Sequence, residues 1–143
     1  MKKKEYEFKF IKDNPDAEKR KLECEKITNQ FPDKIPVICE KDPESKILNK
    51  IEKTKFLIPN TFTVGKFNLM IRKKLNIGEE EGKNAIFLLA KAPNAFISLV
   101  GDAPLSQVYE NYKNPQDGFL YIIYTSEIFM GTKNVTFKFK INY

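Results

Sequence analysis

Histidine is absent from this chain of 143 residues, and its absence excludes several kinds of catalytic and metal site. Nucleophilic sites of the Ser-His-Asp and Cys-His types need an imidazole as their general base. Zinc sites commonly use histidine too, and two cysteines are too few for a site built from cysteine alone. The six glycines stand singly, so the sequence holds no glycine-rich loop for a phosphate group. We therefore predict a protein that is not an enzyme and that uses no metal or other cofactor.

Cysteine is scarce, and we expect both cysteines to be reduced thiols because no secretory signal is visible. Cys39 ends the apolar run 35–39, which favours burial as a small hydrophobic side chain. Cys24 lies among charged residues, which favours a thiol at the surface.

Long apolar stretches are also missing, since none approaches the roughly 18–20 residues that a membrane-spanning helix needs. Lys2 stands where N-myristoylation needs glycine, and the last three residues form no prenylation signal. We expect a cytoplasmic protein, and any membrane attachment must use another route.

The residues that are present describe one folded domain, with 41% hydrophobic and 13% aromatic residues. The formal net charge of +6 suits an anionic partner. Nucleic acid, an acidic lipid surface and an acidic peptide all fit that description, so charge alone leaves three classes of partner open.

The first predicted element is a helix over residues 16–30. Asn14 is expected to be its N-cap, and Pro15 is expected to take the first helical position. Within this helix, Leu22 and Ile27 are expected to face the core.

Two short apolar segments, 35–40 and 55–58, predict strands of a hairpin with a long loop. A helix capped by Thr63 follows and is expected to end near Gly78. The segment 85–90 is apolar throughout, which predicts an interior strand.

A short helix around 104–112 and a strand over 119–124 complete the order of elements. Two strands, a packed helix and two further strands describe a β-grasp, which is an α+β fold. A ferredoxin-like sandwich is the architectural alternative, although that fold begins with a strand–helix–strand unit rather than a hairpin.

Four segments carry a family resemblance: 31–38 (FPDKIPVI), 53–59 (KTKFLIP), 71–74 (IRKK) and 117–121 (DGFLY). In this order and spacing they resemble the GABARAP-type family of ubiquitin-like autophagy modifiers, over roughly residues 8–131. The resemblance implies a ubiquitin-like β-grasp with an N-terminal helical extension.

The resemblance also implies a division of the chain into four parts. Residues 1–30 form the helical extension packed on the core, and residues 31–124 form the core itself. Residues 125–131 form a flexible arm that ends at Gly131, and residues 132–143 form an extension that proteolysis removes.

In the resembling family a cysteine protease exposes a terminal glycine, which here is Gly131. Activating and conjugating enzymes then pass that glycine to phosphatidylethanolamine, which creates a lipidated pool on autophagosome membranes. Glycine suits this role because it lacks a Cβ, so its carbonyl is open to attack. The family usually has an aromatic residue before the glycine, whereas this chain has Met130.

Family members recruit receptors and adaptors that carry an aromatic residue, any two residues and then an aliphatic one. An extended peptide adds to an exposed strand edge in this mode, and the candidate edge is the segment 53–58. By position, the family's aromatic pocket maps onto six residues: Glu23, Ile27, Pro36, Lys55, Leu57 and Phe119.

The family's aliphatic pocket maps onto a second set of residues: Phe56, Ile58, Pro59, Phe62, Phe67, Met70 and Arg72. Lys53, Lys73 and Lys74 form a basic rim that would attract acidic residues beside such a motif. Core packing is an equally open interpretation for Ile27, Phe67 and Phe119.

The residues after Gly131 alternate between apolar and polar from Val135 to Tyr143, which is the pattern of a strand. Two interpretations stay open: a removable extension, or a strand that pairs with a sheet edge before processing. At the other end of the chain, Tyr6, Phe8 and Phe10 are a hypothetical membrane contact of the lipidated protein.

Three other functions compete with a conjugated modifier. A ubiquitin-like adaptor that is never conjugated is one, because of Met130 and the long tail. A basic nucleic-acid-binding module is another, although no RNA-binding signature is present and we expect no nucleic acid as partner. A carboxylate-based enzyme is the third, although nothing marks one acidic pair over another.

Overall fold

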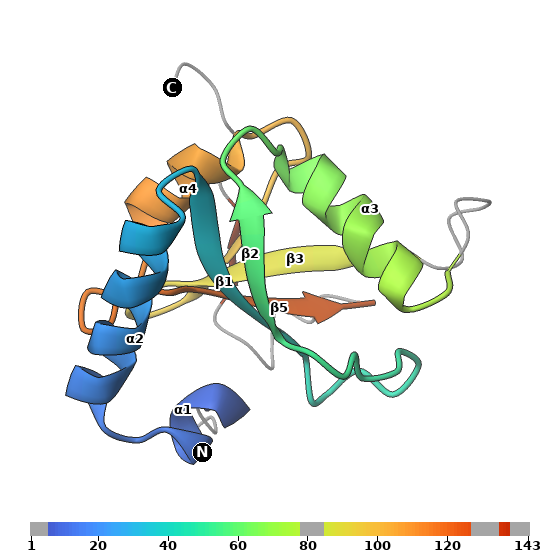
Figure 1. The fold of residues 1–143 in the computed structure, drawn as a ribbon. Helices are drawn as coiled ribbons and strands as arrows, with labels where there is room; N and C mark the ends of the chain where they lie inside the picture. Colours follow the sequence, from blue (N-terminus) through green and yellow to red (C-terminus); the bar gives the residue numbers. More distant parts are fainter. Residues whose placement is uncertain (1–5, 78–84, 127–134, 138–143) are drawn as a thin grey trace.

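The computed structural model describes residues 6–77, 85–126 and 135–137. Helices and strands both occur along this part of the chain, as the predicted α+β class requires. The elements drawn in Figure 1 are α1 (Lys9–Asp13), α2 (Ala17–Gln30), β1 (Lys34–Lys41), β2 (Lys55–Pro59), α3 (Val64–Lys74), β3 (Phe87–Lys91), β4 (Phe96–Ser98), α4 (Leu105–Tyr112), β5 (Leu120–Thr125) and β6 (Val135–Phe137).

The apolar runs of the sequence become the interior of one mixed sheet. β1 and β5 are buried along nearly their whole length, which is typical of strands covered on both faces. These two strands pair in parallel, with Val37 beside Leu120. The described strands follow the order β2-β1-β5-β3-β4-β6. The predicted hairpin of β1 and β2 is confirmed by their antiparallel pairing, which also excludes the ferredoxin-like alternative.

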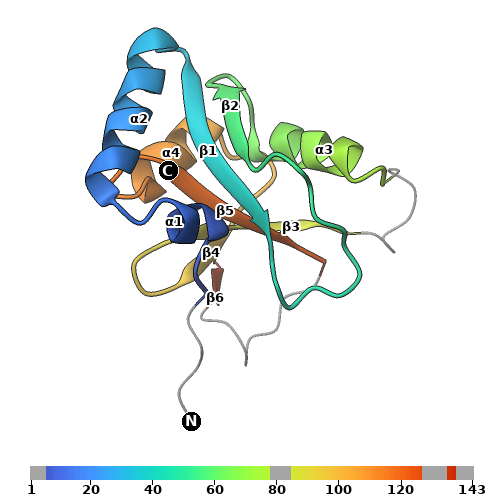
Figure 2. The same ribbon diagram turned by 60° about the horizontal axis from the view of Figure 1, so that its bottom comes forward.

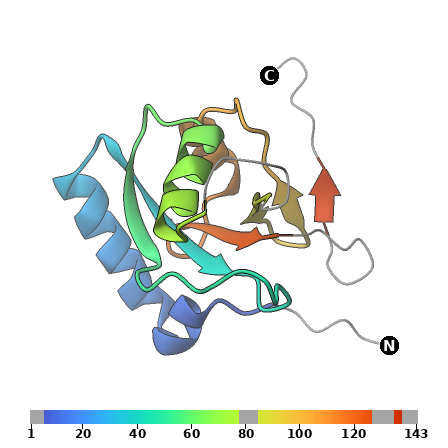
Figure 3. The ribbon, with the colours of Figure 1, turned by 90° about the vertical axis from the view of Figure 1, so that its right-hand side faces the viewer.

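Side chains of β1 and β5 alternate between two hydrophobic clusters on opposite faces of the sheet. Val37 and Leu120 belong to the first cluster, together with residues of α3 and α4. Ile38 and Tyr121 belong to the second cluster, to which α1 and α2 contribute. The helices therefore cover both faces of the sheet, with α3 and α4 on one face and α1 and α2 on the other, as Figures 1 and 3 show.

The start of α2 differs from the prediction. Asp16, not Asn14, is the N-cap, and its carboxylate accepts hydrogen bonds from the backbone N–H of Glu18 at 3.0 Å and Lys19 at 3.4 Å. Pro15 lies outside the helix, and Asn14 instead ends α1, a helix that the sequence pattern did not reveal.

The buried face of α2 also differs from the prediction. Arg20, Cys24 and Ile27 share the inner face at spacings of four and three residues, and the first two are buried. Leu22 lies two residues from Cys24, hence about 200° around the helix, and is 62% exposed. The prediction for Ile27 is confirmed, whereas the predictions of an inward Leu22 and a surface Cys24 are wrong.

The next helix begins as predicted, since the Thr63 hydroxyl accepts a hydrogen bond from the backbone N–H of Lys66 at 3.1 Å. Its helical residues end at Lys74, and Asn76 takes a left-handed φ of 57° that terminates the turn. Gly78, near which the helix was expected to end, lies outside the described residues.

The N-terminal aromatic residues belong to the second cluster rather than to an exposed surface. Phe8 is 2% exposed, and its ring lies 5.0 Å from that of Tyr121. Tyr6 and Phe10 are half-buried against the same cluster. The hypothesis that all three touch a membrane is therefore wrong for Phe8.

The end of the chain adds a strand that belongs to the sheet. β6 pairs in parallel with β4, beside which it lies in Figure 2. The interpretation of the tail as a strand that pairs with a sheet edge is confirmed for Val135–Phe137, and removal of the tail stays a prediction. Within the described residues, no helix combines the length and the apolar character needed to cross a membrane.

Candidate functional site

β2 is the last strand on its side of the described sheet, as Figure 1 shows. It pairs with β1 only, from Lys55 beside Ile38 to Pro59 beside Lys34. Its outer backbone groups therefore have no strand neighbour among the described residues. The predicted edge is confirmed, and it is the geometry that a peptide needs in order to add a further strand.

Side chains along this edge alternate between the surface and the core. Lys55 and Leu57 are exposed, Leu57 by 37%. Phe56 and Ile58 are 8% and 2% exposed and belong to the first cluster. The two predicted pockets therefore begin on opposite faces of one strand, because neighbouring side chains of a strand point to opposite sides.

The aromatic set lies between β2 and α2. The Lys55 ammonium forms an ion pair with the Glu23 carboxylate on α2 and lies 5.5 Å from the centre of the Phe10 ring. Ile27, one helical turn after Glu23 on α2, is half-buried and packs against the second cluster. An ion pair between two partly exposed side chains contributes little to stability, so a ligand can displace it at low cost.

Two members of the aromatic set are not available at the surface. Phe119 is fully buried, with its ring 5.3 Å from that of Phe10, and Pro36 is buried within β1. In this structure Phe119 belongs to the second cluster and packs against Phe10 rather than facing the surface. Core packing is therefore the role that the structure shows for it.

The aliphatic set lies between β2 and α3. The rings of Phe56 and Phe67 meet edge to face with centres 5.9 Å apart, and Phe67 is fully buried. Phe62 and Met70 are partly buried against the same cluster, so they are the apolar members nearest the surface. Pro59 and Arg72 are also partly exposed.

The basic rim is at the surface, where the prediction placed it. Lys53, Lys73 and Lys74 are all exposed, and the last two belong to the last turn of α3. The Lys74 ammonium lies 5.6 Å from the centre of the Phe56 ring, which brings a positive charge next to the aliphatic set. Positive charges in the last turn of a helix also stabilise it, because they interact favourably with the negative end of the helix dipole.

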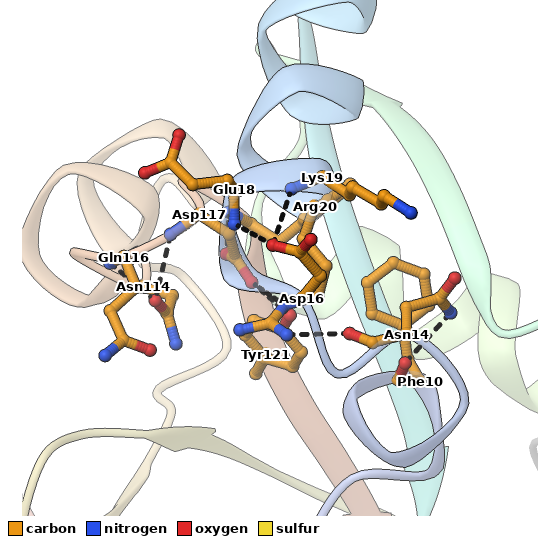
Figure 4. Close-up of polar contacts among 11 residues, drawn as sticks. Phe10, Asn14, Asp16, Glu18, Lys19, Arg20, Asn114, Gln116, Asp117 and Tyr121 are labelled. Atoms are coloured by element: carbon orange, nitrogen blue, oxygen red, sulfur yellow. Dashed lines mark hydrogen bonds and ion pairs between the residues drawn. The ribbon is translucent and has the colours of Figure 1, made fainter.

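A buried polar network, which the sequence did not reveal, holds α2 against β5 (Figure 4). Nε of Arg20 and Oδ2 of Asp117 are 2.8 Å apart, and both side chains are almost fully buried. The same Oδ2 accepts a hydrogen bond from the Tyr121 hydroxyl at 2.6 Å. The Asp117 Oδ1 accepts one from the backbone N–H of Phe119 at 2.9 Å. Burial, together with this hydrogen bond to Asp117, raises the pKa of Tyr121 well above its ordinary value.

Cys24 packs against the same turn. Gly118 has a φ of +87°, and a Cβ added there would lie 3.1 Å from the Cys24 Sγ. Burial raises the pKa of the Cys24 thiol to about 11, so the thiol stays protonated at neutral pH. This network and Cys24 together fix the position of α2, and with it Glu23 and Ile27, relative to β2.

The remaining predicted site residue, Gly131, lies outside the described residues. β5 ends at Thr125, six residues before it.

Comparison with known proteins assigns the family. The model of the family described as autophagy protein Atg8, ubiquitin like, matches residues 19–131. Autophagy-related protein 8 of Schizosaccharomyces pombe is 42% identical over 125 residues, which cover 85% of this chain and 93% of that protein. Autophagy-related protein 8e of Arabidopsis thaliana is 40% identical over 126 residues, which cover 88% and 95%.

This chain belongs to the Atg8 family. The crystal structure of Trypanosoma brucei ATG8 is similar with a TM-score of 0.71 and 31% identity, over 84% of this chain and 95% of that one. The predicted ubiquitin-like fold with N-terminal helices is thereby confirmed, as is the predicted family, since GABARAP-type proteins lie within the Atg8 family. As an Atg8 protein, the chain is a ubiquitin-like modifier of autophagy and not an enzyme.

Proposed function

We propose that a cysteine protease cuts this Atg8 protein after Gly131 and that activating and conjugating enzymes then join the glycine to phosphatidylethanolamine. The lipidated form resides on autophagosome membranes, and an unlipidated pool stays in the cytoplasm. The match to the family model, which ends at residue 131, supports this position for the cut. Twelve residues follow Gly131 and lie beyond the family match.

The processing step is tested with the protein from its own cells. Mass spectrometry of the whole protein should find chains that end at Gly131, some of which carry the mass of the lipid. The variant Gly131→Ala should lose membrane association, because its Cβ hinders attack at the carbonyl. A pool that consists only of the full-length, unlipidated chain would refute the proposal.

We also propose that the lipidated protein recruits receptors and adaptors through an aromatic-x-x-aliphatic motif added to β2. The observation that supports this proposal is the alternation along the edge, where Leu57 faces the surface and Phe56 faces α3. Residues three apart in an extended peptide point to opposite faces, about 10 Å apart along the strand. The aromatic residue of the motif then meets the α2 side of the edge, and the aliphatic residue meets the α3 side.

This geometry makes the spacing of the motif a sharp test. A peptide in which one intervening residue is deleted keeps both anchors but points them to the same face. We expect its affinity for the full chain to fall at least about tenfold, measured by fluorescence anisotropy of a labelled peptide. Equal affinity of the two peptides would contradict strand addition at β2.

A pair of matched variants tests the edge itself. Leu57→Asp introduces a charge on the outer edge of β2, whereas Leu22→Asp introduces the same charge on the exposed outer face of α2. The first variant should lower peptide affinity at least about tenfold, and the second should change it less than about twofold. If both variants bind like the wild type, the β2 edge is not the site.

A further inference from the structure

The opposite end of the sheet carries a second edge, and the C-terminal segment of the chain occupies it. β4 pairs with β3 on its inner side and with β6 on its outer side. Val135 lies beside Phe96, and Phe137 lies beside Ser98. In the uncut chain, therefore, residues downstream of Gly131 form a strand of the folded domain.

The β4 edge is held firmly by the body of the protein. Phe96 is 7% exposed within the second cluster, and its ring centre lies 6.1 Å from that of Tyr6. The Tyr6 hydroxyl in turn donates a hydrogen bond of 2.8 Å to the Glu40 carboxylate on β1. These contacts do not involve the tail, so they hold β4 in place independently of β6.

The backbone geometry identifies the tail residue on which this docking depends. The N–H of Leu99 donates to the carbonyl of Leu88 beside β3, so the alternation of a strand directs the N–H of Ser98 to the β6 side. Thr136 is the partner of Ile97, and in a parallel ladder a residue bonds to the neighbours of its partner. Thr136 is therefore the residue of β6 whose backbone N–H and C=O are directed to β4.

The register also fixes where β6 lies relative to the end of β5. Followed across β4, β3 and β5, Val135 lies level with Tyr121. Ser126 lies five residues beyond Tyr121 in the direction of β5, and Val135 lies three strand spacings away across the sheet. The distance between Ser126 and Val135 is therefore about 22 Å.

We propose that the β4 edge is a docking site for the chain's own C-terminal segment and that docking restrains cleavage after Gly131. A protease that cuts an extended chain in a narrow channel must draw the residues on both sides of the cut away from the domain. The pairing of β6 with β4 opposes this, because Val135 comes only four residues after Gly131 in the sequence. Cleavage then follows the fraction of molecules in which β6 has left β4, because only the open form is a substrate. This inference rests on the proposed processing at Gly131.

Two proline variants of the full-length chain test the inference. Thr136→Pro removes the backbone N–H that bonds to β4, so it should undock the tail. Asn142→Pro places the same residue further along the tail, after the paired residues of β6, and serves as the control. With the processing cysteine protease of the same cells, we expect Thr136→Pro to be cut about tenfold faster than wild type and Asn142→Pro to be cut at the wild-type rate.

Hydrogen exchange of the same proteins provides a readout that does not depend on the protease. The Ser98 amide should exchange at least about tenfold more slowly in wild type and Asn142→Pro than in Thr136→Pro, because β6 covers it. Equal exchange would overturn the docking, and equal cleavage rates would overturn the restraint alone. If the protease cuts none of the forms after Gly131, the proposed processing is refuted and the restraint with it.

Discussion

Replacing Asp117 with alanine should destabilise this protein more than most single substitutions do, because it removes one half of a buried ion pair. Arg20 would keep its charge in a site that is 4% exposed, at the junction of α2 and β5. The hydroxyl of Tyr121 and the backbone N–H of Phe119 would also lose the oxygens that accept their hydrogen bonds.

The magnitude follows from what is left without a partner. Removing one member of a buried ion pair typically costs about 3–5 kcal/mol, largely because the other charge stays buried. Each further donor that loses its acceptor adds about 1–3 kcal/mol when no water replaces the oxygen. We therefore expect the free energy of unfolding to fall by at least about 3 kcal/mol, a large part of the roughly 5–15 kcal/mol that small domains possess.

Urea unfolding of the full chain, followed by circular dichroism, measures this loss. Asp13→Ala is the matched control, because it breaks an exposed pair between Lys9 and Asp13 and should leave the unfolding midpoint unchanged. The double variant Arg20→Met, Asp117→Ala should recover part of the stability, since it leaves neither charge of this buried pair. A loss below about 1 kcal/mol for Asp117→Ala would refute the argument that this pair holds α2 in place.

Three other predictions concern packing and thiol chemistry. Phe67→Ala should lower the free energy of unfolding by about 3–5 kcal/mol in urea titrations, whereas Leu69→Ala, on the exposed face of the same helix, should change it by less than about 1 kcal/mol. Gly118→Ala should cost about 1–2 kcal/mol because of its positive φ, and Cys24→Ala in the same chain should not restore the loss fully, since the backbone strain remains. Burial raises the pKa of Cys24 to about 11 and also raises the pKa of Cys39. The free energy of unfolding should therefore be constant at pH values below about 9, the pKa of a thiol in the unfolded chain, and should fall as the pH rises toward 11. In mass spectra, iodoacetamide should modify both thiols in urea and neither in the native protein at pH 8, and rapid native modification would contradict their burial.

The interior of the fold could be predicted from sequence because its strands are apolar without interruption. β1 and β5 need no alternation to be recognised, since helices cover both of their faces. α2 was harder, because its inner face carries Arg20 and Cys24 while Leu22 points to solvent. A charged residue that is buried only because its partner lies 97 residues away leaves no local signal in the sequence.

In the candidate site, too, some positions follow from the local sequence pattern and others depend on how distant elements pack. The positions of Leu57 and Phe56 on opposite faces follow from strand alternation alone, so sequence reasoning reached them. That Phe119 is fully buried depends on how α1 and α2 cover the sheet, which no pattern near residue 119 encodes. β4 was missed because three residues are too short a run to show a period.

The β6 strand covers one edge of the described sheet, whereas the β2 edge is open and must be protected from unspecific pairing in another way. An open strand edge invites unspecific pairing, which proteins limit with short strands, lysine and proline. β2 has all three features: it spans five residues, begins with Lys55 and ends with Pro59. Lys55 is moreover engaged by Glu23, so a peptide that adds to β2 must compensate for that ion pair. For a peptide bound as proposed, we expect an acidic side chain next to the motif to take the place of Glu23, which a basic one cannot do. Because the ion pair is partly exposed, the expected preference for acidic peptides is modest.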